Sequence, residues 1–549
     1  MTNNAEQLEE LTEFNDYQYD YLESVQEAKR ILEDSKITTE NTVFEGSRWF
    51  LEDYVTDNNV CINFEKLNVS MTNIKFLNMS VIKCWVASLI NSFSTRTVKT
   101  YYSGLISFFD LTDNLRKLNI NEVLFTFEKY SIYTRLYICN SISNLIDYSN
   151  EIFGDKSKEV FSLIKGLSKT FVLQTGVRKL PKTKDILIFN NIFEDYFSKK
   201  LNEEEYYKWM PVYFWWKLTT IIPMRPTEFA KLERNCIRKE QSSYYLRINR
   251  IKANQNMDNQ RYLSDIIIPK EIFIDMKNYI NRVKKFGDSD TFISFPSIIN
   301  IFNLDKKSIK RSKFTNLKFR RILNEFYNEI VFGQYNVGYK NSSDRVLSIE
   351  KLLLAGDTRH LAFINLKRQG YHPVEIARIG GHNSLRSQEH YFSHLNNLVD
   401  LEILSLMSNY NTELSVSTLD PSFVDKYIIK PNYGNHKLEL EDGYCTDPEM
   451  NCRVEDCWEC EHWRISADEF LTKKHLLDEK IANKRNELDE VLDSMGILYA
   501  SIYNNLHGDN SITYKKSEQT ILFQHAKKID SIIASYIDLN KLREQGGLN

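Results

Sequence analysis

The chain has 549 residues, which is too long for one hydrophobic core and predicts three or four domains of ordinary size. Hydrophobic residues make up 42% of it and charged residues 26%, and it has no run of eighteen uncharged apolar residues, so a globular protein without a membrane partner is expected. The N-terminus is acidic where a signal peptide would be basic and then apolar, which predicts a cytoplasmic protein.

The net charge of −3 hides a strong segregation of charge along the sequence. Residues 1–60 hold 15 acidic and 4 basic side chains, whereas residues 171–320 hold 29 basic and 16 acidic ones. A basic face on this later part can neutralise phosphates and release counterions, so the net charge does not exclude a nucleic-acid partner. For any single cation, a solvated helix face is an equally good interpretation.

Residues 1–60 are predicted to form an acidic helical arm. Leu8, Leu11, Phe14 and Tyr17 recur at steps of three among carboxylates, as on one face of a helix. The arm either docks on a neighbouring part of the protein or is poorly ordered.

Residues 61–174 are predicted to form a helical domain. One helix is expected to begin after the hydroxyl of Ser94, and it carries Val98, Leu105 and other apolar residues on one stripe. Its basic residues, which we expect to contact nucleic acid, are Arg96 and Lys99.

A basic linker is predicted over residues 175–184, where glycine and proline interrupt the helical pattern. Such a segment can follow a nucleic-acid backbone between two domains. Its four cations are Arg178, Lys179, Lys182 and Lys184.

Residues 185–410 alternate helix and hairpin patterns, which predicts a mixed α+β domain. Pro373 followed by Val-Glu-Ile-Ala-Arg-Ile predicts a short helix that ends at Gly380 and Gly381. Two guanidinium groups that can clamp a phosphate, an imidazole and a phenol are what phosphoryl transfer through a covalent tyrosine intermediate requires. In chain order the candidates are Arg225, Lys252, Arg359, His382 and Tyr391.

The order and spacing of these residues resemble the tyrosine recombinases, also called the phage integrase family. That family has an early arginine, an Arg-His pair, Gly-His, and a tyrosine nine residues after that histidine, as Tyr391 follows His382 here. The resemblance implies that Tyr391 attacks DNA to give a 3′-phosphotyrosine, while Arg225, Arg359 and His382 stabilise the transition state. Lys252, between two strand-like runs, matches the family's hairpin lysine and would be the general acid.

The resemblance also implies a mainly α fold, in which a helical core-binding domain precedes the α+β catalytic domain and a helical C-terminal extension follows. Double-stranded DNA is the implied partner, within a homo- or hetero-tetramer that can include other recombinases. The implied activity is site-specific recombination that integrates or excises a mobile element. Catalysis would need no metal ion, ATP or other cofactor. Two further cations expected to contact DNA are Lys310 and Arg311.

One position departs from the family pattern. Gly356 stands where the family usually has the first histidine of its His-x-x-Arg box, so a group that would orient the phosphate or accept the tyrosine proton is missing. His360 or a water molecule could replace it. Two alternatives to the active recombinase therefore stay open, namely a recombinase-derived DNA-binding accessory protein and a type IB-like topoisomerase.

The eight cysteines fall into two groups. Cys61, Cys84, Cys139 and Cys236 are scattered in apolar or helical contexts and are predicted to be reduced, buried residues. Within residues 411–465 the other four are close together, and short spacings of this kind are typical of structural zinc sites, with uncoordinated thiols as the alternative. The predicted ligands are Cys445, Cys452, Cys457, Cys460 and His462. A Cys-x-x-Cys segment after the catalytic domain resembles the extension of some transposon-borne recombinases.

Residues 466–549 are predicted to be a helical hairpin or a coiled coil. Apolar residues recur at steps of four and three from Leu477 to Ile502, with Lys484 as the one interruption. The glycine break at Gly508 favours an antiparallel hairpin over a dimer zipper.

Overall fold

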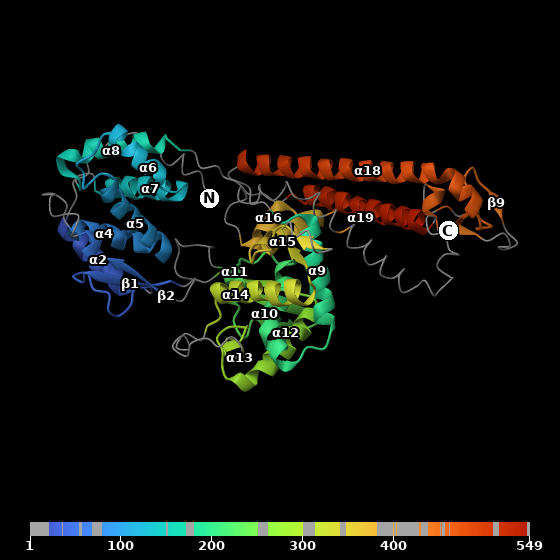
Figure 1. Ribbon diagram of the computed structural model, residues 1–549, viewed down its shortest axis with the longest axis horizontal. Helices are drawn as coiled ribbons and strands as arrows, with labels where there is room; N and C mark the ends of the chain where they lie inside the picture. The colour runs from blue at the N-terminus through green and yellow to red at the C-terminus, as the bar shows by residue number, and fades with distance from the viewer. Residues whose placement is uncertain are drawn as a thin grey trace. The chain divides into compact units, whose positions relative to one another are not determined.

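The computed structural model is mainly helical with small sheets, which confirms the predicted fold class (Figure 1). It describes residues 21–35, 37–53, 58–67, 79–149, 152–171, 180–250, 262–299, 313–340, 347–381, 399, 402, 428–429, 437–450, 452, 456–460, 462–508 and 515–545. These form two compact units that divide near residue 178, inside the predicted linker, and each unit is described by itself.

The first unit is built from helices around one apolar core, with a β-hairpin at its N-terminal side. Its helices are α2 (Tyr21–Asp34), α4 (Met79–Ser92), α5 (Thr95–Leu111), α6 (Ile120–Lys129), α7 (Ile132–Tyr148) and α8 (Ser157–Ser168), with the 3-10 turn η1 (Gly154–Lys156). Its hairpin pairs β1 (Arg48–Asp53) with β2 (Asn58–Asn63) in antiparallel register.

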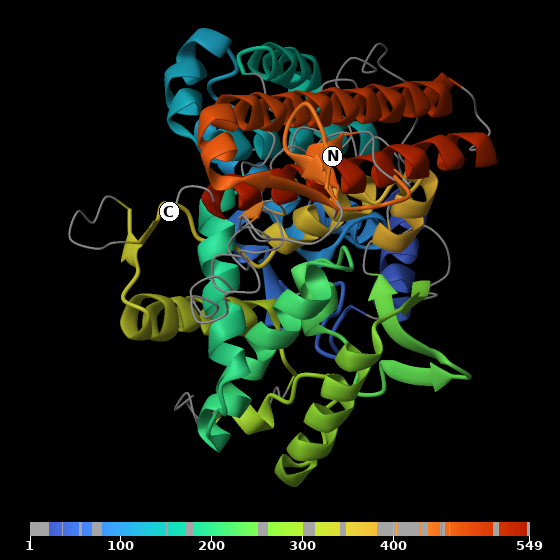
Figure 2. The ribbon, with the colours of Figure 1, turned by 90° about the vertical axis from the view of Figure 1, so that its right-hand side faces the viewer.

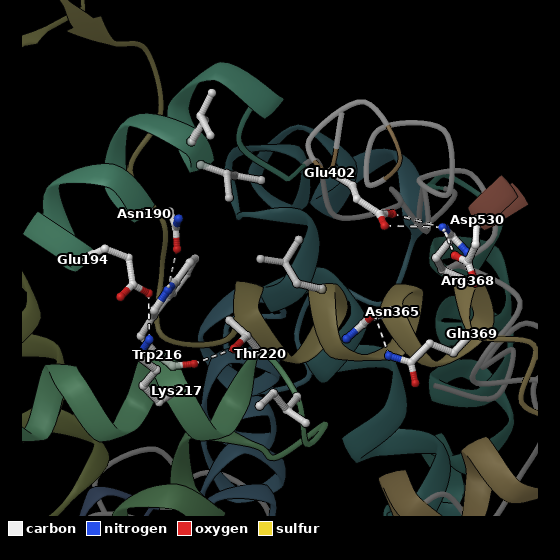
Figure 3. Close-up of a pocket in the computed structure, with 14 residues that line it drawn as sticks. Asn190, Glu194, Trp216, Lys217, Thr220, Asn365, Arg368, Gln369, Glu402 and Asp530 are labelled. Carbon is white, nitrogen blue, oxygen red and sulfur yellow. Dashed lines mark hydrogen bonds and ion pairs between the residues drawn. The ribbon is translucent and has the colours of Figure 1, made fainter. Parts of the chain in front are cut away.

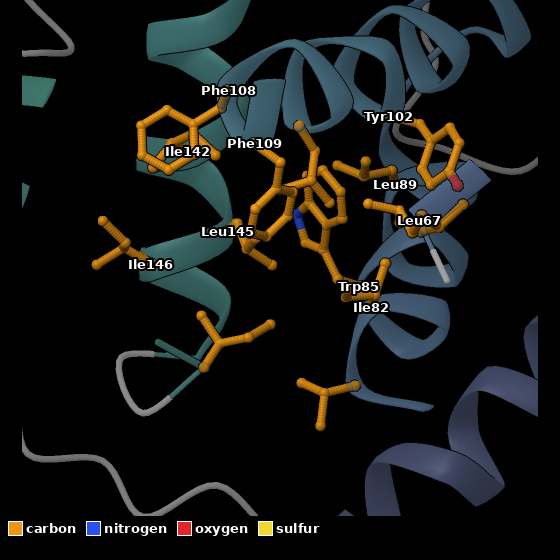
Figure 4. Packing of buried hydrophobic residues seen from close by; sticks show 14 of the residues in the cluster. Leu67, Ile82, Trp85, Leu89, Tyr102, Phe108, Phe109, Ile142, Leu145 and Ile146 are labelled. Carbon is orange, nitrogen blue, oxygen red and sulfur yellow. The ribbon is translucent and has the colours of Figure 1, made fainter. Parts of the chain in front are cut away.

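The core of the first unit lies between α4, α5 and α7. Figure 4 shows Trp85 of α4 facing Phe109 of α5 and Leu145 of α7, all fully buried. Ser94 caps α5 as predicted, because its hydroxyl accepts the N–H of Thr97. Polar caps and buried apolar stripes together explain why these segments are helices.

The predicted acidic arm differs from the structure in its second half. Residues 48–53 and 58–63 are strands, and Trp49 and Ile62 on them are fully buried in the core of the first unit. The predicted boundary at residue 60 thus falls inside β2. The sequence pattern did not reveal these strands because each is only six residues long, too short for its period to stand out.

The second unit begins with α9 (Thr183–Ser198), α10 (Glu203–Thr219) and α11 (Pro226–Ala230). A three-stranded sheet follows, in the order β3 (Ile237–Glu240), β4 (Ser243–Arg250), β5 (Tyr262–Ile267). The next elements are α12 (Lys270–Val283), η2 (Lys284–Phe286), α13 (Pro296–Ile299), α14 (Asn316–Phe326), η4 (Tyr327–Gln334), β6 (Gly338–Tyr339), β7 (Ser348–Ile349), α15 (Asp357–Arg368) and α16 (Pro373–Gly380).

After α16 come a small four-stranded sheet and two long helices. The sheet consists of β8 (Ile428–Ile429), β9 (Leu438–Glu439), β10 (Tyr444–Cys445) and β11 (Trp463–Ser466), with the 3-10 turn η7 (Cys457–Glu459). The helices are α18 (Ala467–Gly508) and α19 (Lys516–Gln545), which run side by side in both views (Figures 1 and 2).

The two long helices pack as an antiparallel hairpin. Ion pairs join Asp478 to Arg543 and Glu487 to Lys528, so rising numbers on one helix meet falling numbers on the other. Leu488, Met495 and other residues of the predicted seam are buried. They share a core with Phe363 and other apolar residues of α15 and α16, so the tail is part of the second unit.

Candidate active site

Arg225 and Glu228 form the start of the candidate site, at the N-terminus of α11. Glu228 is buried, and its carboxylate accepts the backbone N–H of Arg225 at 2.8 Å and Nη1 of the same residue at 2.7 Å. Pro226 occupies the first helical position, where its fixed φ suits the helix and its missing N–H costs nothing. The early arginine of the predicted motif is therefore held at a helix start by its own helix.

Arg359 of α15 reaches the same carboxylate from a distant part of the sequence. Its Nη1 lies 3.6 Å from Oε2 of Glu228 and donates to the carbonyl of Pro223, while Nη2 donates to the carbonyl of Gly380 at 2.9 Å. The guanidinium carbon lies 4.9 Å from the ring centre of Phe363. The structure thus brings together the two arginines that the motif predicts.

Arg250, the last residue of β4, is a third guanidinium group at this site and was missed by the sequence analysis. Its Nη1 donates to Oε2 of Glu228 at 3.0 Å, and Nη2 donates to the carbonyl of Ile379 in α16. The only signal in the sequence was an arginine at the end of a strand-like run, which is also common at solvent-exposed strand ends. We call Arg225, Arg250, Arg359 and Glu228 the arginine cluster.

The electrostatics of the arginine cluster favour an anion. Burial alone would raise the pKa of the Glu228 carboxyl, but the charges of Arg250, Arg225 and Arg359 outweigh it and hold that pKa below its usual value. Three cations and one carboxylate leave a net charge of +2 on these four side chains. The Arg225 side chain is 23% exposed and Arg359 is 8% exposed, whereas Arg250 is fully buried. Arg225 and Arg359 are therefore the groups of the cluster that an anion can reach.

The glycines at the end of α16 pack closely against the cluster. Gly381 adopts the left-handed conformation at φ 61°, and a Cβ there would lie 2.9 Å from Cδ of Arg250. A Cβ on Gly380 would lie 2.5 Å from the ring of Phe363. Pro373 at the first helical position and Gly381 at the C-cap confirm the helix predicted from the sequence.

Gly356 lies at the N-cap of α15, three residues before Arg359. Residues three apart share a helix face, so a side chain at this position would lie on the same side as Arg359. Beside it, His360 is half-buried on α15. The departure from the family pattern is therefore next to the arginine cluster.

Three of the five predicted catalytic residues lie outside the described residues, namely Lys252, His382 and Tyr391. Gly381, the neighbour of His382, and Arg250, two residues before Lys252, are the last described residues before each gap. Four of the eight predicted DNA-contacting residues also lie outside the described residues, namely Arg178, Lys179, Lys310 and Arg311.

The other predicted DNA contacts are described, and several are bound within the protein. In the first unit, Nε of Arg96 lies 2.7 Å from Asp53, and Nζ of Lys99 donates to the carbonyl of Cys61 at 2.6 Å. Burial lowers the pKa of the Lys99 ammonium. In the second unit Lys182 and Lys184 are exposed at the start of α9, and Lys182 pairs with Glu350 at 2.6 Å.

The predicted zinc ligands surround η7 and the strands β10 and β11. Burial raises the pKa of the Cys457 thiol, and the neighbouring Cys452, Asp456, Cys460 and Cys445 raise it further. Among the described residues, however, no three His, Cys, Asp or Glu side chains are close enough to hold a metal ion. As placed, these side chains do not form a zinc site.

A hollow of about 550 Å³ in the second unit lies apart from the arginine cluster, and its lining includes none of the four cluster residues. Figure 3 shows that its polar side chains bond to one another: Lys217 pairs with Glu194, and Arg368 with Asp530, at 2.7 and 2.6 Å. Since these charges are satisfied inside the protein, the hollow carries no sign of a charged ligand.

No family model and no curated protein matches the chain. Solved structures similar to it include the XerH site-specific recombinase bound to difH substrate, with 12% identity and a TM-score of 0.38 over 69% of this chain and 94% of that chain. The Tn1549 transposon integrase in complex with transposon right end DNA has 13% identity and a TM-score of 0.36 over 57% and 94%. The XerA recombinase has 13% identity and a TM-score of 0.26 over 56% and 90%.

These names are those of recombinases and an integrase, the class of protein that the sequence motifs resemble. At identities of 12–13% and TM-scores of 0.26–0.38, we transfer no residue role or activity from them to this chain. Separately, none of the described helices is both long and apolar enough to cross a membrane.

Proposed function

We propose that the protein is a tyrosine recombinase that cleaves and rejoins double-stranded DNA through a 3′-phosphotyrosine intermediate, in the integration or excision of a mobile element. The observation that carries this proposal is the arginine cluster. Arg225 and Arg359 come from separate motifs, meet on Glu228, and keep a net positive charge with limited exposure. Charge of this kind is suited to a phosphodiester, which carries one negative charge.

The chemistry assigned to the cluster is stabilisation of the transition state. The phenolic oxygen of Tyr391 would attack the phosphorus, forming the 3′-phosphotyrosine bond as the bond to the 5′-oxygen breaks. Arg225, Arg359 and His382 would donate hydrogen bonds to the equatorial oxygens as their charge grows. Lys252 would protonate the leaving 5′-oxygen.

The tyrosine proton needs an acceptor, because a phenol with a pKa near 10 is protonated at neutral pH. His360 or a water molecule would take it, since Gly356 has no side chain for this role. Attack by a 5′-hydroxyl of a partner duplex would then reverse the step and release Tyr391. This requires two duplexes, so the expected assembly is a tetramer on DNA that can include other recombinases.

The test uses a duplex that carries the element's end and is nicked near the crossover point, so that cleavage traps the covalent adduct. A protein–DNA adduct that resists denaturation is expected from the native protein and is expected to be absent from Tyr391→Phe. Filter binding of the same duplex by Tyr391→Phe is the control for DNA affinity, which should be unchanged. An adduct that persists in Tyr391→Phe would contradict the choice of nucleophile.

Gly356 favours one second candidate, a DNA-binding accessory protein derived from a recombinase. The same experiment separates the candidates. DNA binding without any adduct would indicate the accessory protein, and an adduct that relaxes supercoils and rejoins only its own strand would indicate a topoisomerase. Exchange of strands between two duplexes would indicate the recombinase.

Structural zinc is a separate proposal that rests on the spacing of the cysteines. Binding by Cys445, Cys452, Cys457, Cys460 and His462 would need these side chains to draw together, because they form no metal-binding group as placed. The metal content of the purified protein tests it. One zinc per chain that is lost in Cys457→Ser would support the proposal, and a metal-free native protein would end it.

A further inference from the structure

Arg250 is unusual in the arginine cluster because no part of its side chain is exposed. A fully buried guanidinium cannot contact a DNA phosphate, so its role differs from that assigned to Arg225 and Arg359. Burying a charge is costly unless it is paired and hydrogen-bonded. The contacts of Arg250 therefore indicate what this charge does.

These contacts join two elements that the sequence does not place together. Nη1 donates to Glu228 of α11, and Nη2 donates to the carbonyl of Ile379 near the end of α16. The planar guanidinium can hold two acceptors at a fixed angle and spacing, which the single ammonium of a lysine cannot do. Arg250 thus fixes the end of α16 relative to the start of α11.

Gly381 extends the contact along the chain. Gly381 is in the left-handed conformation, and a Cβ added to it would lie 2.9 Å from Cδ of Arg250. Its backbone therefore lies directly against the alkyl chain of the arginine. Gly381 immediately precedes His382 in the sequence. Arg250 therefore packs against the last residue before the histidine, at a helix end that Arg359 also holds through the carbonyl of Gly380.

We propose that Arg250 is a positioning residue, which holds the end of α16 and the entry to His382 in register with Arg225 and Glu228. This inference rests on the proposed function. It assigns Arg250 no contact with DNA, and it predicts that disturbing the arginine slows cleavage without weakening DNA binding.

The first experiment compares Arg250→Lys with the native full-length protein on the nicked duplex. The lysine keeps the positive charge but can hold only one of the two acceptors well. We expect DNA affinity within about twofold of native and a single-turnover rate of adduct formation lower by about 10- to 100-fold, as small misplacements of reacting groups produce. Arg247→Lys is the matched control, since Arg247 lies on the same strand, is 40% exposed and pairs with Asp265, and it should cleave at the native rate.

Gly381→Ala disturbs the same contact from the other side and serves if Arg250→Lys fails to fold. It should also lower the cleavage rate while leaving DNA affinity unchanged. Gly287→Ala is its control, because Gly287 has φ 93° but no atom within 4 Å of a would-be Cβ. It carries the backbone strain without the close contact.

The double variant decides whether the two residues act together. If they act through one contact, Arg250→Lys with Gly381→Ala should cleave no more slowly than the slower single variant. The inference would be overturned if the rate losses of the two single variants multiply in the double variant, or if Arg250→Lys cleaves within twofold of native. The proposed function would stand in either case. A native protein that binds DNA but forms no adduct would instead overturn the proposed function, and the inference with it.

Discussion

The two ends of helix α15 are held in different ways. At its N-terminal end, Arg359 enters a largely buried cluster of three arginines around one carboxylate. At its C-terminal end, α18 and α19 hold the turn between α15 and α16 by apolar packing, hydrogen bonds to the backbone, and the ion pair of Arg368 with Asp530. The N-terminal end thus gathers three cations on one carboxylate, whereas each charge that pairs at the C-terminal end has its own partner.

The C-terminal end of α15 shows how closely the hairpin is fitted. The hydroxyl of Tyr499 in α18 lies 3.0 Å from the carbonyl of Lys367 and 2.7 Å from that of Tyr371. The side chain of Gln519 in α19 donates to the carbonyl of Gly370 at 2.7 Å and accepts from the N–H of His372 at 2.8 Å. The hairpin therefore supplies hydrogen-bond partners for the backbone groups of the turn that would otherwise bond to water.

The largest effect is expected from removing the carboxylate of the charged end. Glu228→Ala leaves the buried guanidinium groups of Arg250 and Arg359, and the partly exposed one of Arg225, without their shared counter-charge. This should lower the free energy of unfolding by about 3–5 kcal/mol and abolish adduct formation. Urea denaturation measures the first effect. Glu203→Ala, which removes a carboxylate that is 79% exposed and paired with Lys285, is the control and should leave stability unchanged. Equal effects of the two variants would contradict the contrast between buried and exposed charge.

The second effect tests how tightly the C-terminal end of α15 is packed. Gly370 has φ 77°, and a Cβ there would lie 2.6 Å from the carbonyl oxygen of Leu522 in α19. Gly370→Ala should cost about 2–4 kcal/mol, from backbone strain together with overpacking. Gly287→Ala, at φ 93° and ψ −175°, carries backbone strain alone and should cost about 1–3 kcal/mol, less than Gly370→Ala. If thermal unfolding shows the same loss for both, the hairpin does not press on the turn.

A smaller effect is expected for the hydrogen bonds between the hairpin and the turn. Tyr499→Phe removes one hydroxyl and leaves the two carbonyls it serves, which should cost about 1 kcal/mol. The cleavage rate should stay at the native value, since the arginine cluster is not touched. A Tyr499→Phe protein that is as stable as native but cleaves slowly would contradict the division between the two ends.

The smallest effect concerns Lys367 of α15. Burial lowers the pKa of its ammonium group well below the usual value. The unfolded chain then binds more protons than the folded chain between the folded pKa and about 10.4, so stability should rise with pH across that window. Lys367→Met should flatten this rise and stabilise the protein at neutral pH by about 1 kcal/mol or less. Unfolding midpoints measured from pH 7 to 10 test both the pH dependence and the gain in stability. If the substitution leaves the slope of stability against pH unchanged, groups other than Lys367 cause the rise.

The sequence predicted one end of α15 far better than the other. The motif pointed to Arg225 and Arg359, which the structure brings together on Glu228, because it restricts both residue type and order. The proline and glycines of α16 marked its two ends. Arg250 could not be found in this way, since its role depends on a long-range contact with Ile379 that leaves no local pattern.

The tail shows a second limit of pattern reading. Periodicity predicted long helices from Leu477 to Ile502, but it could not tell which surface their apolar stripe would cover. From Leu488 to Ile502 the stripe shares a core with Phe363 and Ile364 of α15, so a segment predicted as a separate extension belongs to the core of the second unit. The start of the stripe, Leu477 and Ile481, instead packs in a cluster with Trp458 and Trp463. The strands β1 and β2 were missed for the related reason that short hairpins are defined by the partner they pack against.

The close fit of Gly370 against Leu522 also has a consequence for synthesis of the protein. α15 and α16 leave the ribosome well before α19, so the surface that α19 covers stays exposed to water until α19 has been synthesised. The helix that carries Arg359 can then reach its final packing only late. A nascent chain that still lacks α19 would accordingly hold Arg359 on a helix whose outer support is incomplete.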